Sequence, residues 1–299
     1  LNLATGLALA QSKNGFNLDH ARVPASQIFQ GGPPRDGIPS IDQPRFVPAK
    51  QANFLEPHDR VLGLAIGTEH KAYPINIMNW HEIVNDTIAG QASVITFCPL
   101  CGTGMAFKAQ FDGKKFRFGV SGLLYQSDVL LYDRQSESLW SQVMTESISG
   151  PMKGRKLEQL PLQHTSWKDW QNRYPDTLVL SQKTGYNRDY SDSPYSGYGS
   201  SSTLYFDINN KPPATYHPKE QVLGIERKGK FKAYPFSELS QNKAAVFEDS
   251  FAGETLLIHW NNRERSAYIT NKNGDELVST TAFWFAWYTF HPQTLVFSH

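Results

Sequence analysis

Two stretches of this chain repeat one another, and this repetition restricts the possible folds more than any other feature of the sequence. A block beginning Trp-x-x-Trp-x-x-x-x-Pro-x-Thr-Leu-Val starts at Trp167 and again at Trp284, an offset of 117 residues. Another block repeats at an offset of 161 residues and consists of Val61-Leu-Gly63 and Lys71-Ala-Tyr-Pro74, which recur as Val222-Leu-Gly224 and Lys232-Ala-Tyr-Pro235. Far more positions match than the roughly one in twenty expected by chance. We therefore interpret the chain as an internal duplication.

Each copy has the pattern of a β-rich unit with one main helix. Apolar residues at helical spacing predict helices over 76–87 and 167–174. Short apolar runs bounded by turn residues predict strands over 61–66, 71–75, 91–97, 105–111, 115–120 and 177–181. The sequence therefore predicts an α+β, β-rich fold of two related halves, the first of which carries a long insertion.

The repeats and the composition also predict the division of the chain. Residues 1–60, rich in Pro and Gly, are expected to wrap the first half, and residues 61–182 are the first repeat. Residues 183–221, rich in Ser, Tyr, Gly, Asn and Pro, predict an irregular connection. Residues 222–299 are the second repeat.

The two copies differ in ways that point to function. From the shared glycine to the shared tryptophan the first copy spans 77 positions and the second spans 31, so the first carries 46 additional residues. Asn261 stands in the second copy where the first has Cys98, and His81 is also confined to the first copy. Because related halves keep what the fold requires, we expect the chemistry in the first copy, near these residues.

The pair Cys98-Pro-Leu-Cys101 is the strongest chemical signal. Such a pair fits a dithiol redox site, a metal-binding knuckle or a local disulfide. A thioredoxin-type site needs a helix that begins at the motif, whereas the residues from Met105 predict a strand. A knuckle is favoured, with Gly102 permitting the tight turn. Two thiolates leave a metal incompletely coordinated, and His81 is the best-placed third ligand for Zn(II) or Cu(I).

Three functional hypotheses remain open. The first is an exported metal-binding protein, including a redox metalloenzyme, with Cys98, Cys101 and His81 as copper or zinc ligands and with Glu82 and Asp128 as catalytic acid–base groups. The second is a metal-free thiol–disulfide oxidoreductase, which requires an accessible Cys98 of low pKa. The third is a non-enzymatic binding or surface-assembly protein in which the two cysteines form a structural disulfide. The expected partner is an unidentified small molecule or protein.

Charge and hydropathy exclude other classes of function. The 29 basic and 28 acidic side chains give a net charge of +1, which provides no electrostatic reason to expect a nucleic-acid partner. No apolar run reaches the roughly 20 residues of a transmembrane helix. The apolar segment from Leu1 to Ala10 resembles the end of a secretory signal, which favours a periplasmic or extracellular protein with that signal removed. An apolar segment packed on the body of the mature protein is the alternative interpretation.

Several dense motifs in the chain carry a resemblance to a known family. They are Met78-Asn-Trp-His-Glu-Ile-Val-Asn-Asp86, Phe97-Cys-Pro-Leu-Cys-Gly-Thr103, Phe118-Gly-Val-Ser-Gly-Leu-Leu-Tyr125, Leu139-Trp-Ser-Gln142 and Trp284-Phe-Ala-Trp287. Over residues 45–298 the chain resembles the bacterial family catalogued as domain of unknown function 3179. The resemblance implies that the cysteine knuckle, the segment around His81 and residues 119–125 belong to the family's recurrent pattern, and that the protein is exported. It implies no reaction.

Overall fold

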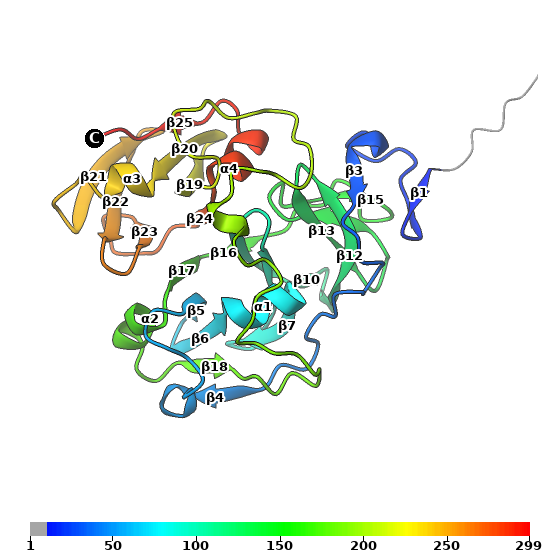
Figure 1. Cartoon of the computed structure of the whole chain (residues 1–299), viewed down its shortest axis with the longest axis horizontal. Helices are drawn as coiled ribbons and strands as arrows, with labels where there is room; N and C mark the ends of the chain where they lie inside the picture. The colour runs from blue at the N-terminus through cyan, green and yellow to red at the C-terminus, as the bar shows by residue number, and fades with distance from the viewer. Residues whose placement is uncertain (1–10) are drawn as a thin grey trace, which may run out of the picture.

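The protein is β-rich and its sheets have a five-bladed β-propeller arrangement (Figure 1). The computed structural model describes residues 11–299, so the segment 1–10, interpreted above as the end of a signal, lies outside the described residues. Strands account for 41% and helices for 12% of the described residues. The prediction of an α+β fold in two halves is therefore wrong, because five sheets, and not two mixed units, make up the body of the protein.

We number the five sheets as blades 1 to 5. Blade 1 has the strand order β17-β5-β6-β18-β4, from Leu162–Ser166, Arg60–Ile66, Glu69–Pro74, Leu178–Leu180 and Phe46–Pro48. Blade 2 has the order β16-β9-β8-β7, from Gln159–Leu160, Thr103–Lys108, Gln91–Cys98 and Ile83–Ile88. Blade 3 has the order β15-β14-β13-β12-β3, from Glu146–Ser149, Leu139–Ser141, Asp128–Asp133, Phe118–Tyr125 and Ile28–Gln30.

The second part of the chain forms the remaining two blades. Blade 4 has the order β24-β19-β20-β25, from Thr280–Phe283, Gln221–Arg227, Lys230–Pro235 and Leu295–Val296. Blade 5 has the order β21-β22-β23, from Val246–Phe251, Glu254–Asn261 and Ser266–Thr270. Two short hairpins lie outside the blades: β1–β2, from Ser12–Lys13 and Phe16–Asn17, and β10–β11, from Gln110–Phe111 and Lys114–Lys115.

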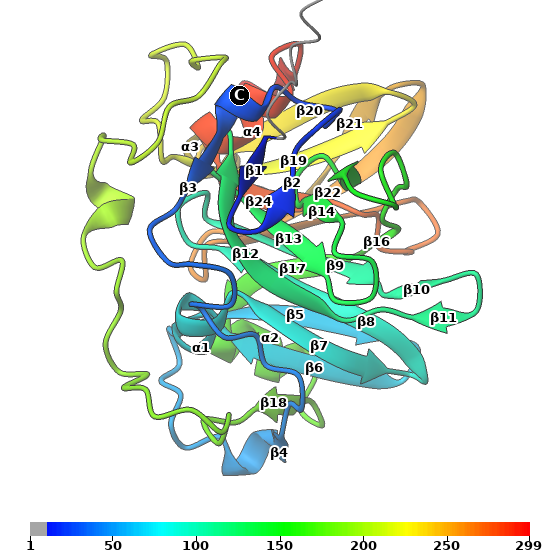
Figure 2. The same cartoon turned by 90° about the vertical axis from the view of Figure 1, so that its right-hand side faces the viewer.

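Short helices connect strands, either within one blade or from one blade to the next. The α-helices are α1, Ile75–His81, α2, Trp167–Arg173, α3, Phe236–Leu239, and α4, Trp284–Phe290. Single 3-10 turns are formed by η1, Ala25–Gln27, η2, Ala49–Gln51, and η3, Tyr198–Ser200. Within residues 11–299, no helix has the length and apolar character needed to cross a membrane. Figure 2 shows that the segment between β18 and β19 runs along one side of the molecule, past α1.

The repeated sequence blocks form a packing device that occurs in blades 1 and 4. The Trp170 ring of α2 lies over Gly63 of β5, where a Cβ atom would come within 2.2 Å of the ring. In blade 4 the Trp287 ring lies over Gly224 at the same 2.2 Å. The Trp170 Nε1 donates a hydrogen bond to the Thr177 Oγ1 at 3.0 Å, and Trp287 bonds Thr294 in the same way at 2.9 Å. The repeated glycine, tryptophan and threonine are thus explained by one local contact.

Because these glycines leave no room for a methyl group, replacing Gly63 or Gly224 by alanine is expected to lower the free energy of unfolding by about 1–3 kcal/mol each. Gly199→Ala is the matched control, since its added Cβ would meet only the Phe283 ring at an ordinary 3.9 Å. Denaturant unfolding of the three variants checks this. Equal stability of all three would contradict the packing argument.

The helix predicted over 76–87 is shorter in the structure, and this prediction is wrong in its second half. Helix α1 ends at His81 because Glu82 has a positive φ of 58°, which a helix does not accommodate. The following residues, several of them β-branched, form β7 and pair with β8 from Ile83 opposite Thr96 to Ile88 opposite Gln91. The predicted hairpin over 61–75 and the short helix at Trp167 are confirmed.

The insertion that distinguishes the first copy supplies most of blade 3. Strands β12 to β15 all lie between the cysteine pair and Trp167, and β3 from the N-terminal part of the chain completes their sheet. The backbone of Asn85 in β7 bonds Ile41, and its side chain bonds the backbone of Phe118 through both its oxygen and its nitrogen. Blade 3 is thereby fixed beside blade 2, which carries the cysteines.

Candidate functional site

The cysteine pair forms a tight turn between β8 and β9. Cys98 is the last residue of β8 and lies opposite Thr103, the first residue of β9. The backbone N–H of Cys101 bonds the Cys98 carbonyl at 3.2 Å, and Gly102 has a φ of +60° that permits the turn. The Cys101 carbonyl accepts a hydrogen bond from the backbone of Phe283 at 2.8 Å. The strand predicted after the motif is confirmed, so no helix begins at the cysteines.

A β-hairpin of the insertion lies over this turn. Strands β12 and β13 are joined by a two-residue loop, Gln126 and Ser127, and both residues have positive φ angles, 55° and 65°. Such loops usually contain glycine or asparagine, and each non-glycine residue here costs about 1–2 kcal/mol. The Gln126 Oε1 accepts hydrogen bonds from the Asn209 backbone and the Thr289 hydroxyl, at 2.6 and 2.9 Å. The strained loop is thus held in place from outside.

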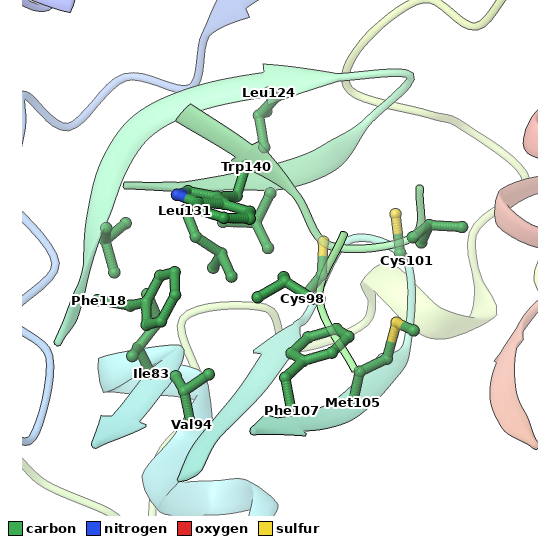
Figure 3. Packing of buried hydrophobic residues seen from close by; sticks show 14 of the residues in the cluster. Ile83, Val94, Cys98, Cys101, Met105, Phe107, Phe118, Leu124, Leu131 and Trp140 are labelled. Atoms are coloured by element: carbon green, nitrogen blue, oxygen red, sulfur yellow. The ribbon is translucent and has the colours of Figure 1, made fainter. Parts of the chain in front are cut away.

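This hairpin brings a carboxylate to the two thiols. One possible ligand atom each from Cys98, Cys101 and Asp128 lies within 4.8 Å of the others, and all three residues are buried. Both thiols also face the Ser127 carbonyl, at 3.7 Å from Cys98 and 3.3 Å from Cys101. In Figure 3 the sulfur atoms of Cys98 and Cys101 point to the side on which Leu124 of the hairpin lies. We call these three residues the Cys-Cys-Asp cluster.

Burial dominates the electrostatics of the cluster. It raises the pKa of Asp128 to about 7, although hydrogen bonds from the backbone of Val143 and Val129 and from the thiols of Cys98 and Cys101 oppose the increase. Burial also raises the pKa of Cys98, and it raises the pKa of Cys101 well above its usual range. The Asp128 Oδ2 accepts a hydrogen bond from Val143 at 3.1 Å, while its Oδ1 is buried without a hydrogen-bond partner among residues 11–299. A bound cation would instead stabilise the ionised forms of these three groups.

A pocket of about 400 Å³ borders the cluster at Cys98. Glu82, at the junction of α1 and β7, lines the same pocket and is 7% exposed. Burial raises the pKa of Glu82 to about 8, and the Tyr195 hydroxyl donates a hydrogen bond to its Oε1 at 3.4 Å. Glu82 is therefore a protonated carboxylic acid at neutral pH, placed beside one of the thiols.

The raised pKa of Glu82 predicts how the free energy of unfolding depends on pH. In the folded, metal-free protein Glu82 keeps its proton up to about pH 8, whereas in the unfolded chain it loses it near pH 4.5. The folded state binds more protons at Glu82 between these values, so this group gives the free energy of unfolding a downward slope from pH 5 to 8. Histidines whose pKa burial lowers, such as His164 and His291, oppose this slope at the acidic end of the range. Glu82→Gln should reduce this slope without removing it, because Asp128 titrates in the same direction. Chemical denaturation across this pH range measures the effect, and an unchanged slope in the variant would contradict it.

The structure does not bring His81 to the Cys-Cys-Asp cluster. Its Nδ1 lies 2.7 Å from the Pro39 carbonyl and its Nε2 lies 2.6 Å from the Tyr190 hydroxyl. Because a carbonyl accepts, the Nδ1 carries the proton and the Nε2 accepts from Tyr190. Burial lowers the pKa of His81, which is consistent with a neutral ring. The role of His81 as a metal ligand stays a sequence-based prediction. The geometry does not favour it, because both ring nitrogens already have hydrogen-bond partners.

Sequence reasoning missed the residues that the connection 183–221 contributes. This segment places Tyr195 and Tyr205 on the pocket and Tyr198 near the thiols, whose charges influence its pKa. The buried Lys219 Nζ donates hydrogen bonds to the backbone carbonyls of Tyr198, Ser201 and Thr203, at 2.7, 2.6 and 2.8 Å. The abundance of tyrosine between two repeats was the one available signal.

The comparisons with known proteins agree with the motifs. A family model described as a protein of unknown function (DUF3179) matches residues 35–277. The chain belongs to this family, since the match covers well over half of its length. No curated protein and no solved structure matches the chain.

Proposed function

We propose that this member of the DUF3179 family binds a zinc ion through Cys98, Cys101 and Asp128. The observation that supports the proposal is the convergence of two thiols and a carboxyl group within 4.8 Å in a buried site, with the Asp128 Oδ1 lacking a partner among residues 11–299. Sulfur and carboxylate oxygen are both common zinc ligands. An unpartnered buried carboxyl oxygen is costly unless a cation or donor meets it.

The ligand set favours zinc over copper. Cu(I) prefers soft sulfur ligands, whereas Zn(II) accepts thiolate and carboxylate in one site. The sequence alone left both metals open because it paired the thiols with His81. Asp128 replaces the imidazole by a carboxylate oxygen, which is a harder ligand. This change favours Zn(II) over the soft ion Cu(I).

Three protein ligands are typical of catalytic rather than structural zinc sites. A zinc ion in such a site acts as a Lewis acid and leaves a position for a water molecule or a substrate. Cys98 belongs to the cluster and also lines the pocket, so a molecule in the pocket would lie beside the site. Glu82 lines the pocket too, and its pKa of about 8 suits a group that gives and takes a proton near neutral pH.

The other two hypotheses have less support. A thiol–disulfide oxidoreductase needs an exposed cysteine of low pKa, whereas Cys98 is 1% exposed and burial raises its pKa. A structural disulfide would join Cys98 to Cys101, whereas both are free thiols in the structure. We therefore place the metal hypothesis first.

Elemental analysis tests the proposal. The protein, purified under reducing conditions and supplied with zinc, is expected to retain one zinc ion per chain after removal of free metal. The double variant Cys98→Ser, Cys101→Ser should retain none. Zinc-free wild-type protein, or equal zinc in the double variant, would overturn the proposal.

A further inference from the structure

The pocket beside the Cys-Cys-Asp cluster has a predominantly apolar wall. Its volume of about 400 Å³ lies in the range of small-molecule sites, roughly 300–1,000 Å³. Hairpin β12–β13 and the segment around Ile38 form much of its wall, which includes Ile38, Leu100, Val120, Leu123, Leu124 and Val129. Because these side chains offer no hydrogen bonds, most of the surface of an occupant must be apolar as well.

The charge of the pocket excludes most ionic occupants. Among its lining residues within 11–299, none is Lys, Arg or His, so an anion would find no counter-charge. Glu82 is the one carboxyl group in the described lining, and it is only 7% exposed. Any ion in this pocket would exchange its hydration for mainly apolar walls. An uncharged molecule avoids this penalty.

The polar groups of the pocket are grouped together. Glu82 accepts a hydrogen bond from the Tyr195 hydroxyl at 3.4 Å, and both residues line the pocket together with Cys98. A tyrosine hydroxyl can donate a hydrogen bond, and carboxyl oxygens can accept one. A carbonyl or hydroxyl oxygen of the occupant would be recognised at this polar end, beside Cys98.

Hydrogen bonds hold the cover of the pocket in place. Its cover belongs to the connection 183–221, where the Phe206 carbonyl accepts a hydrogen bond from the Ser127 hydroxyl at 2.9 Å. Lys219 stabilises the neighbouring backbone through its three hydrogen bonds to carbonyl oxygens, described above. Tyr205 remains 60% exposed and lines the pocket, so it marks the mouth. A cover held in this way reduces the cost of ordering a loop on binding.

We propose that this pocket takes a small, uncharged, mainly apolar molecule with one carbonyl or hydroxyl oxygen, which lies against Glu82 and Cys98. The claim that this molecule is a substrate rests on the proposed zinc site. The claim that it binds depends only on the pocket, and the experiments below separate the two claims.

Two fluorescent probes that differ in charge test the inference. N-phenyl-1-naphthylamine is neutral, and 8-anilino-1-naphthalenesulfonate has the same ring system with an added sulfonate. The neutral probe is expected to bind metal-free and zinc-loaded protein at least about tenfold more tightly than the sulfonate, because the pocket offers the anion no partner. Equal or tighter binding of the sulfonate would overturn the uncharged class.

Substitutions in the wall of the pocket test whether the probe binds there. Ile38→Trp is expected to fill the cavity and weaken binding of the neutral probe at least about tenfold, with zinc content unchanged. Tyr205→Ala, at an exposed position that does not threaten folding, should weaken it by about threefold through lost aromatic contact. Val278→Trp fills a different cavity and is the control. Binding that none of the pocket variants weakens would overturn the inference. Probe binding by wild-type protein that takes up no added zinc would overturn only the proposed function.

Discussion

Replacing Asp128 by asparagine is expected to weaken zinc binding by more than the roughly 100-fold that accompanies loss of an outer hydrogen-bond partner of a metal ligand. The amide is neutral and a poor zinc ligand, while its shape matches the carboxyl group and keeps the Val143 hydrogen bond available. The cysteines remain, so residual binding isolates the contribution of the third ligand. Competition with a chromophoric chelator under reducing conditions measures the change.

Two control variants make this result specific. Asp112→Asn makes the same chemical change at an exposed position that pairs with Arg155, and its zinc affinity should equal that of wild type. His81→Gln removes the imidazole that the sequence suggested as a ligand. Because both of its nitrogens have other partners, this variant should be less stable but should keep its zinc. Loss of zinc in His81→Gln with retention in Asp128→Asn would replace Asp128 by His81 as the ligand.

Replacing Asp86 by alanine is expected to lower the free energy of unfolding by about 3 kcal/mol, since removing one partner of a buried ion pair leaves the other charge uncompensated. The Lys71 and Asp86 side chains are 6% and 7% exposed, and their charged groups are 3.0 Å apart. The Tyr73 hydroxyl also donates to Asp86, at 2.7 Å. Glu69, 3.3 Å from the lysine, keeps the loss near the lower end of the usual 3–5 kcal/mol.

The corresponding site between blades 4 and 5 provides a matched comparison. It contains the same three residue types, Lys232, Tyr234 and Asp249. The lysine and aspartate side chains are 12% and 17% exposed there, so Asp249→Ala should cost less than Asp86→Ala. Denaturant unfolding of both variants gives the comparison. An equal or larger loss for Asp249→Ala would show that burial does not set the strength of these pairs.

Local features of the fold were predictable, whereas its assembly was not. The strand after Cys101 could be predicted because Met105 and its neighbours have a strong strand pattern, and the hairpin at Gly67 follows from two short runs around a turn. The repeats identify similar local contacts, such as Trp170 on Gly63. They do not specify how many sheets form, and the insertion makes a blade of its own, which led to the wrong prediction of two halves.

The same distinction applies to the candidate site. The cysteine pair is a local motif, so its position between two strands follows from the sequence. Asp128 was recognised as a functional candidate, but its place beside the thiols depends on how the β12–β13 hairpin folds over another blade. His81 seemed close because its helix precedes β8. The positive φ at Glu82 ends that helix and turns Glu82, rather than His81, toward the pocket.

The most direct test of the zinc site is the X-ray absorption spectrum of zinc-loaded protein at the zinc edge. The account predicts two sulfur ligands at about 2.3 Å and oxygen ligands at about 2.0–2.2 Å, with the carboxylate contribution lost in Asp128→Asn. A spectrum without sulfur, or with four sulfur ligands, would contradict zinc coordination by Cys98, Cys101 and Asp128.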